Sequence, residues 1–171
     1  MSVLRMLLVF TFAAFWSCQS AALEQNVTAV SRDGNTLVLT TDKGQVRVRF
    51  YTTEAVEVFY QPTGVNQLDS FAINADAGNL PLKLAMVNTG HAVRFSSADL
   101  RVQIDKSPLK IRFIKDGKTL LSENAGLQIE QGQRGFSFDL QPQEKLMGTG
   151  QRVLGMNRRG FKLPLYNKAS Y

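Results

Sequence analysis

The sequence predicts an all-β protein, an antiparallel two-sheet β-sandwich, and three observations lead to this fold class. From Val27 to about Leu140, apolar and polar residues alternate with a period of two, as in strands that bury one face. Turn-forming residues interrupt the alternation about every eight to twelve residues. No window supports a long amphipathic helix. About nine or ten short strands with such spacing are typical of a sandwich.

The first predicted strands surround a turn at Asp42-Lys43-Gly44. The strand after this turn places Val46, Val48 and Phe50 on one face and arginines on the other, the pattern of a half-buried strand. Pro62 and Gly64 end the last strand of this group. The segments with alternate apolar residues are 37–40, 46–50 and 56–60.

A section from Val65 to Leu82 has no such pattern and is expected to be a loop or a loosely paired excursion. Beyond it, a turn at Ser96-Ser97-Ala98-Asp99 joins two further strands. Asp116-Gly117 is a strong signal for a two-residue hairpin. The strands expected in this half are 93–95, 100–104, 109–113, 119–122, 127–129 and 136–140. The alternation by itself leaves a barrel open as well as a sandwich.

Residues 1–22 are predicted to be a cleaved signal peptide and not part of the fold. Arg5 provides the positive end, an apolar run extends to Trp16, and Ser20-Ala21-Ala22 offers small residues for cleavage. The run is too short for a membrane span, which needs roughly twenty residues. We therefore expect an exported protein, periplasmic or secreted. Cys18 is the only cysteine and a possible lipid anchor, although bulky Trp16 makes a poor lipidation signal.

The chain offers little that could perform chemistry. Glycoside cleavage or transfer needs two carboxyl groups at a fixed separation, whereas the acidic residues here fall mostly in predicted turns, where they bond local backbone. His91 has no Cys or His neighbour at ligand spacing, so we expect no metal. The sequence contains no nucleophile elbow and no phosphate-binding loop. We predict no catalytic residue and no cofactor.

The net charge of the 171 residues is +6, and the positive charge is concentrated at the end. From Lys145 onward there are six Lys or Arg and no Asp or Glu. Basic tails are typical of proteins that bind nucleic acid. Here, however, the basic residues stand between glycines and apolar residues, and the protein is expected to be exported. We therefore expect no nucleic-acid partner.

The stretch from Glu144 to Tyr171 is also unusually rich in glycine. Such a density indicates backbone with positive φ, or backbone that other atoms approach closely. By spacing alone a glycine-rich β-meander is an alternative. The residues read Glu-x-x-x-Gly-x-Gly-Gln-Arg, then Asn-Arg-Arg-Gly, then Leu-Tyr-Asn. They are Glu144, Gly148, Gly150, Gln151, Arg152, Asn157, Arg158, Arg159, Gly160, Leu165, Tyr166 and Asn167.

This pattern resembles the end of the N-terminal β-sandwich domain of family-31 glycoside hydrolases, just before their catalytic barrel. The wording around QRVLGMNRRG and PLYNKASY is most similar to the bacterial oligosaccharide 4-α-glucosyltransferase branch, which moves single glucosyl units between α-glucans. The resemblance implies a sandwich of the galactose-mutarotase-like type over residues 23–150. It also implies that residues 151–171 lead toward a catalytic barrel that this chain lacks.

The resemblance further implies roles for residues of this stretch. In the family, the loop after Leu-Tyr-Asn lines the innermost sugar subsite, so Asn167 and Tyr171 are expected to contact an α-glucan. Ala169 stands where several family members carry an aspartate, so that contact is missing. Arginine's planar guanidinium suits interfaces, and we expect Arg152, Arg158 and Arg159 to bond groups of the adjoining domain.

Two other functions stay open from the sequence. The chain could be a stand-alone periplasmic carbohydrate-binding module, or a structural β-sandwich of the envelope without a ligand. Our leading expectation is the non-catalytic N-terminal part of an exported, retaining α-glucosidase or α-glucosyltransferase. Several hundred further residues with a barrel pattern in the downstream reading frame would separate it from the other two.

Overall fold

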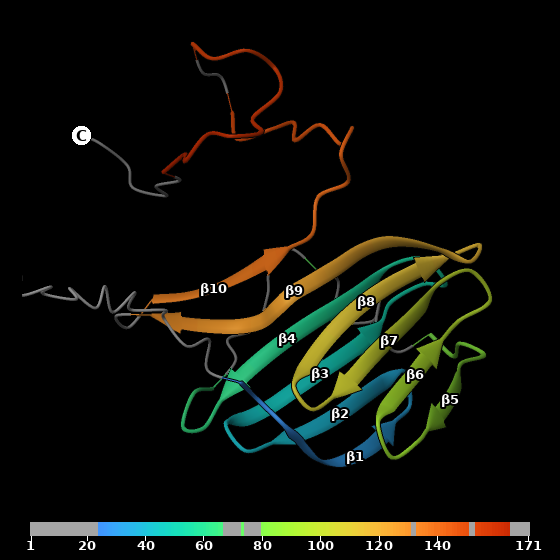
Figure 1. The fold of residues 1–171 in the computed structure, drawn as a ribbon. Coiled ribbons are helices and arrows are strands. Elements are labelled where there is room, and N and C mark those ends of the chain that lie inside the picture. The colour runs from blue at the N-terminus through green and yellow to red at the C-terminus, as the bar shows by residue number, and fades with distance from the viewer. Residues whose placement is uncertain (1–23, 67–72, 74–79, 131–132, 151–152, 165–171) are drawn as a thin grey trace, which may run out of the picture.

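Ten β-strands form two antiparallel sheets in the computed structural model, which describes residues 24–66, 73, 80–130, 133–150 and 153–164. Figure 1 shows the two layers lying face to face. The first sheet has the order β1-β2-β3-β4 and the second β10-β9-β8-β7-β6-β5. The strands are β1 (Val27–Asp33), β2 (Thr36–Thr41), β3 (Gly44–Phe50), β4 (Val56–Pro62), β5 (Ala85–Asn88), β6 (Ala92–Ser96), β7 (Arg101–Lys106), β8 (Leu109–Lys115), β9 (Lys118–Glu130) and β10 (Gln133–Phe138). The predicted all-β, two-sheet antiparallel fold is confirmed.

Each strand pairs with its neighbour in sequence, so both sheets are simple meanders. The predicted hairpin at Asp116-Gly117 joins β8 to β9, and both turn residues have positive φ, 50° and 74°. That geometry matches the twist of the flanking strands and favours Asp-Gly. Among the described residues no helix is long and apolar enough to cross a membrane.

The core lies between the sheets and consists of alternate strand residues. In β3, Val46, Val48 and Phe50 are fully buried, as the sequence pattern predicts. Phe50 meets Phe95 of β6 edge-on, with ring centroids 5.3 Å apart, and so joins the two layers. The buried apolar cluster comprises Leu37, Leu39, Val46, Val48, Phe50, Val93, Phe95, Leu100, Val102, Ile104, Leu109 and Ile111.

One expectation about the second sheet is wrong in detail. The segments 119–122 and 127–129 are one long strand, β9, and not two. Gly126 within it has a φ of 65°, and a side chain there would come within 2.5 Å of the Leu109 carbonyl oxygen, so the glycine permits close strand contact and does not mark a turn. The register also shifts between Phe113 and Ile114 of β8, which breaks the alternation along β9.

The sequence analysis also missed β5. This edge strand has four residues, and all of them are exposed. It therefore lacks the alternation of buried and exposed residues by which the other strands were identified. The described residues of the section from Val65 to Leu82 contain no strand, as expected.

A buried carboxylate links the sheets at the β4 side. Glu123 of β9 is 6% exposed and accepts hydrogen bonds from the Tyr60 hydroxyl of β4 (2.9 Å) and the backbone N–H of Ile111 (2.8 Å). Burial raises the pKa of Glu123, although the bonds from Ile111 and Tyr60 act in the opposite direction. The pKa of Tyr60 is also raised, first by burial and then by the Glu123 charge. Glu123 is thus a polar tie within an apolar interface.

Removal of this tie should destabilise the sandwich. Glu123→Ala leaves the Ile111 N–H and the Tyr60 hydroxyl without their acceptor, and the free energy of unfolding should fall by about 1–3 kcal/mol. Glu123→Gln retains an acceptor oxygen and should cost much less. Urea unfolding of both variants at neutral pH provides the comparison, and equal losses would show that the hydrogen bonds contribute nothing.

The same variants test the pH dependence. Because the pKa of Glu123 is higher in the folded than in the unfolded state, the folded state holds the proton more tightly. Ionisation therefore costs stability as the pH rises from about 4 toward 7. Over that range the wild-type protein should lose stability relative to Glu123→Gln, a difference that urea unfolding at several pH values will measure.

Candidate functional site

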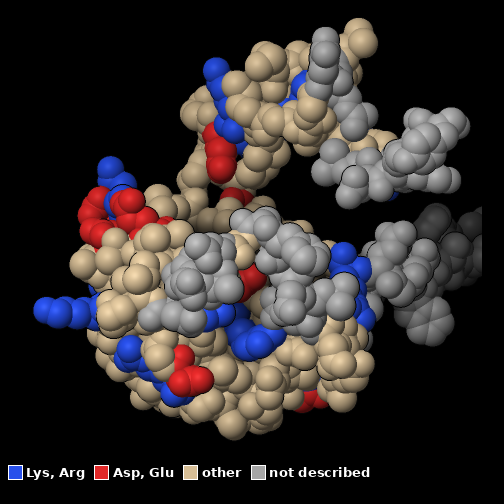
Figure 2. All heavy atoms as spheres, turned by 180° about the vertical axis from the view of Figure 1, so that it is seen from behind, with Lys and Arg blue, Asp and Glu red and all other residues tan. Residues whose placement is uncertain are grey.

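The candidate site is the segment that follows β10, which we call the tail: residues 139–150 and 153–164 of the described chain. It contains turns and bends but no strand. In Figure 1 it leaves the end of β10 and runs above the sandwich. Figure 2 shows it as a separate lobe on a narrow neck. The tail is therefore not folded by the pairing that shapes the sheets.

A run of left-handed backbone lies at the centre of the tail. Gly148, Thr149 and Gly150 have φ values of 106°, 63° and 76°, and Gly160 has 84°. The density of glycine predicted positive φ, and this holds for Gly148, Gly150 and Gly160 but not for Gly155. Thr149 takes the same region without being glycine, which is uncommon and costs conformational energy. Other contacts must hold this run in place.

Arg158 supplies those contacts. Its Nε donates to the carbonyl of Gly148 (3.2 Å), and its Nη2 donates to that of Gly150 (3.2 Å). Its Nη1 donates to the carbonyls of Leu154 (2.8 Å) and Gly155. The residue is 8% exposed, although its neighbours on both sides are exposed. One guanidinium group thus donates hydrogen bonds to four carbonyl groups. Arginine suits this role because its planar group carries five N–H donors in a fixed arrangement.

Asn157 and Arg159 extend the same network. The Asn157 side-chain oxygen accepts hydrogen bonds from the backbone N–H groups of Leu146 (3.0 Å) and Arg159 (3.1 Å). The backbone N–H of Arg158 donates to the Leu146 carbonyl (2.7 Å). Arg159 Nη1 donates to the carbonyls of Gln141 (2.7 Å) and Glu144 (3.1 Å). The three consecutive residues Asn157, Arg158 and Arg159 therefore tie the end of the tail to its beginning.

Glu144 lies at the start of this network, outside any strand. It closes a turn: its carboxylate accepts from the Gln141 N–H (3.0 Å), and its own N–H donates to the Gln141 carbonyl (3.1 Å). Pro142 inside this turn has no N–H to pair with a neighbouring strand. Glu144 has a local structural role, and the Arg159 guanidinium binds to the turn that it closes.

The outside of the tail is apolar. Val153 is fully exposed, Met156 is 74% exposed, and Met147 and Phe161 are more than half exposed. In Figure 2 most of the coloured surface of this lobe is neither acidic nor basic. Soluble domains rarely leave apolar side chains gathered in this way unless they form an interface. The tail has the composition of a contact surface.

The sequence-predicted site residues fall into two groups. Arg158 and Arg159 lie side by side in the tail, where their guanidinium groups bond carbonyls of this chain. Their role at an interface with another domain stays a prediction. Arg152, Asn167 and Tyr171 lie outside the described residues, as do the predicted signal peptide, residues 1–22, and Cys18 within it.

The acidic residues of the sandwich are engaged in local structure. Asp105, for example, accepts two hydrogen bonds from Arg112, at 2.9 and 3.0 Å. Asp42 accepts from the Asn26 N–H at 2.9 Å, and this bond is the largest cause of the lowered pKa of Asp42. A search of the described residues finds no group of three His, Cys, Asp or Glu that could hold a metal ion.

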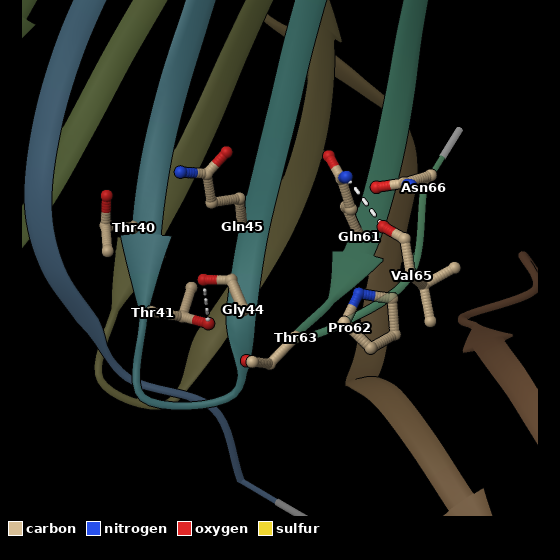
Figure 3. A pocket seen from close by; sticks show the side chains of 10 residues that line it. Thr40, Thr41, Gly44, Gln45, Gln61, Pro62, Thr63, Val65 and Asn66 are labelled. Carbon is tan, nitrogen blue, oxygen red and sulfur yellow. Dashed lines mark hydrogen bonds between the residues drawn. The ribbon is translucent and has the colours of Figure 1, made fainter. Parts of the chain in front are cut away.

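A shallow depression of about 410 Å³ lies at one end of β2, β3 and β4. Figure 3 shows its polar lining, in which Gln61 donates to the Val65 carbonyl (2.7 Å) and Thr41 to the Gly44 carbonyl (2.9 Å). These bonds shape the surrounding turns. Ligand pockets usually present apolar and aromatic walls, whereas the residues here are Thr40, Thr41, Gly44, Gln45, Gln61, Pro62, Thr63, Gly64, Val65 and Asn66. We assign it no ligand.

Comparison with protein families identifies the domain. The sequence model of the glycosyl hydrolase 31 N-terminal galactose mutarotase-like domain matches residues 21–171, which include both the sandwich and the tail. The chain belongs to this family. The resemblance to family-31 glycoside hydrolases and to the galactose-mutarotase-like fold is thereby confirmed. The comparison with curated proteins gives no significant match.

Solved structures agree with the fold of this mutarotase-like domain. A Flavobacterium johnsoniae glycoside hydrolase family 31 dextranase, complexed with isomaltotriose, superposes with a TM-score of 0.69 at 22% identity, over 81% of this chain and 18% of its own. The cycloalternan-forming enzyme from Listeria monocytogenes, complexed with a pentasaccharide substrate, gives 0.61 at 23% identity, over 81% and 14%. The chain thus spans less than a fifth of the length of these proteins.

Sequence reasoning missed two residues of the mutarotase-like domain that the structure makes prominent. Asn157 entered only as part of the family motif, and no pattern showed that its amide joins two distant backbone N–H groups. Glu123 was not singled out at all, because it lies between the polar residues Ser122 and Asn124 of β9. An acid at an inward strand position is a signal that could have found it.

Asn157 can be tested within the mutarotase-like domain. Asn157→Ala removes the acceptor for the Leu146 and Arg159 N–H groups, so local opening of the tail should become easier by about 1 kcal/mol. Amide hydrogen exchange at Leu146 and Arg159 should accelerate, while exchange in β3 and β7 should not change. Asn157→Asp, which retains an acceptor oxygen, is the matched control. Equal exchange in wild type and Asn157→Ala would contradict the network.

Proposed function

We propose that this chain is the non-catalytic N-terminal domain of an exported, retaining α-glucosidase or α-glucosyltransferase that acts on α-glucans. The sandwich serves as the rigid base, and the tail connects it to a catalytic barrel in the full-length protein. The barrel provides the two carboxyl groups that glycoside transfer requires. A leader peptide with Arg5, an apolar run and Ser20-Ala21-Ala22 directs export.

The tail is the observation that carries this proposal. It has no core of its own, presents apolar side chains to solvent, and is nevertheless held in one conformation by Asn157, Arg158 and Arg159. A free-standing carbohydrate-binding or envelope module has no need of such a segment. A domain that continues into a larger enzyme does.

The relatives support the choice of substrate class. The Flavobacterium johnsoniae protein is a dextranase complexed with isomaltotriose, and the Listeria monocytogenes enzyme binds a pentasaccharide. Both belong to longer chains of which this domain covers 18% and 14%. The QRVLGMNRRG and PLYNKASY segments add the narrower preference for transfer of single glucosyl units between α-glucans.

In this proposal the end of the chain, from Asn167 to Tyr171, contacts the substrate, whereas the tail does not. By resemblance, the loop that begins at Asn167 reaches the innermost sugar subsite, and Tyr171 lies near the sugar with it. The Asn167 amide can hold the turn by bonding to backbone. Because Ala169 replaces an aspartate found in several family members, this loop contacts the sugar without that carboxylate.

The first test compares the activity of the full-length protein with that of residues 23–171 alone. The product of the full reading frame should release or transfer glucose from maltose or p-nitrophenyl α-glucoside, with the α-anomer as first product. Residues 23–171 alone should not turn over either substrate, because they lack the required carboxyl pair. Turnover by the short chain above a denatured control would contradict the proposal. A maltooligosaccharide bound tightly by the short chain would favour the stand-alone module.

The second test concerns Asn167 in the full-length protein. Asn167→Ala should lower kcat/KM for α-glucosides by about tenfold, the effect of losing about 1.4 kcal/mol of transition-state stabilisation. The melting temperature should change little. Arg159→Ala is the useful contrast: it should lower the melting temperature with little loss of turnover per folded molecule. Native kinetics for Asn167→Ala would exclude this loop from the active site.

A further inference from the structure

We infer that the tail is a preformed docking element, in which Arg158 holds the backbone from within while Met147, Val153, Met156 and Phe161 make the contact with a second domain. This inference rests on the proposed function in one respect, that the full-length protein contains such a domain. It assigns the contact to the apolar side chains and gives Arg158 a positioning role, whereas the sequence suggested arginine as the contacting residue.

Arg158 has little capacity left for a partner. A guanidinium group carries five N–H donors, and the three nitrogens of Arg158 already donate to the carbonyls of Gly148, Gly150, Leu154 and Gly155. The side chain is almost completely covered by the tail itself. Removal of Arg158 would release the left-handed run at Gly148, Thr149 and Gly150, so its effect on any interface is exerted through the shape of the tail.

The apolar residues have the opposite character. Val153 is fully exposed, and Met156, Met147 and Phe161 each show more than half of their surface to solvent. They lie on both sides of the Arg158 network along the chain. Because that network fixes the backbone that carries them, these side chains need little ordering on binding, which lowers the cost of association. Methionine also adapts well to irregular partner surfaces.

The occupant that fits this surface is the remainder of the full-length chain. The described domain corresponds to only 14–18% of the length of its solved relatives, so most of such a protein lies outside it. The tail leads out of β10, away from the sheets, which places it between the sandwich and that remainder (Figure 1). Lys145, Arg159 and Lys162, all exposed, lie close to the apolar residues in sequence and add positive charge to the tail. The facing surface should therefore be apolar with an acidic rim.

Methionine oxidation provides a direct test in the full-length protein. Dilute hydrogen peroxide converts exposed methionine to its sulfoxide, and peptide mass spectrometry gives the rate at each position. Met147 and Met156 should react several-fold more slowly in the native full-length protein than in the same protein denatured in urea. In the 171-residue chain they should react nearly as fast as when denatured. Met86 of β5, 38% exposed, is the internal reference and should show the same protection in both lengths.

Substitutions complete the test. Val153→Thr combined with Met156→Gln should lower the melting temperature of the full-length protein, and should leave that of the 171-residue chain unchanged. Leu120→Gln changes an apolar residue of β9 that is also more than half exposed, and it should alter neither. Arg158→Ala should accelerate hydrogen exchange in the tail of both proteins, with partial rescue by Arg158→Lys.

Two outcomes would overturn the inference. Equal oxidation of Met156 in native and denatured full-length protein would show that nothing covers the tail. Protection that appears in the 171-residue chain and increases with its concentration would identify a second copy as the occupant. Neither readout uses turnover, so a full-length protein without activity on α-glucans would remove the proposed function and leave the docking result standing.

Discussion

Burial of alternate strand residues between the two sheets is the constraint on which the rest of the sandwich depends. Residues such as Val48 of β3 and Ile104 of β7 are fully buried because their strands present every second side chain to the opposite layer. This requirement fixes the register of the strands with one buried face, such as β3 and β7, since a slip by one residue would turn the apolar set outward. The Glu123 carboxylate is buried with its hydrogen bonds satisfied, by the Tyr60 hydroxyl and the Ile111 N–H.

The backbone hydrogen bonds of the tail are made in a different way, because its described residues form no strand. Its carbonyl groups are collected by arginine side chains instead, four by Arg158 and two by Arg159. Two of the basic residues of this stretch, Arg158 and Arg159, thus use their guanidinium groups within the chain. The exposed surface of the tail that a partner could contact is mainly apolar, with the exposed side chains of Lys145 and Lys162 nearby in sequence.

Much of the sandwich could be predicted because strands with one buried face have a direct sequence signature. Val46, Val48 and Phe50 are an example, and Asp116-Gly117 identified its hairpin. The short exposed strand β5 has no such signature, and the residue pattern did not show that segments 119–122 and 127–129 form one strand through Gly126. The tail motif identified the family, but no local pattern indicates which carbonyls an arginine will reach. That depends on the path of the backbone around Gly148 and Gly150.

The meander topology of both sheets has a consequence for how the protein is made. Within each sheet, every strand pairs with the strand that comes before or after it in the sequence. The hydrogen bonds of both sheets can therefore form between segments that are synthesised one after the other. Domains generally fold as units during synthesis, the N-terminal one first. The sandwich can therefore be in place while later parts of a longer protein are still being translated. The tail follows the sandwich in the chain, so the hydrogen bonds of Arg158 and Arg159 can form on a base that is already folded.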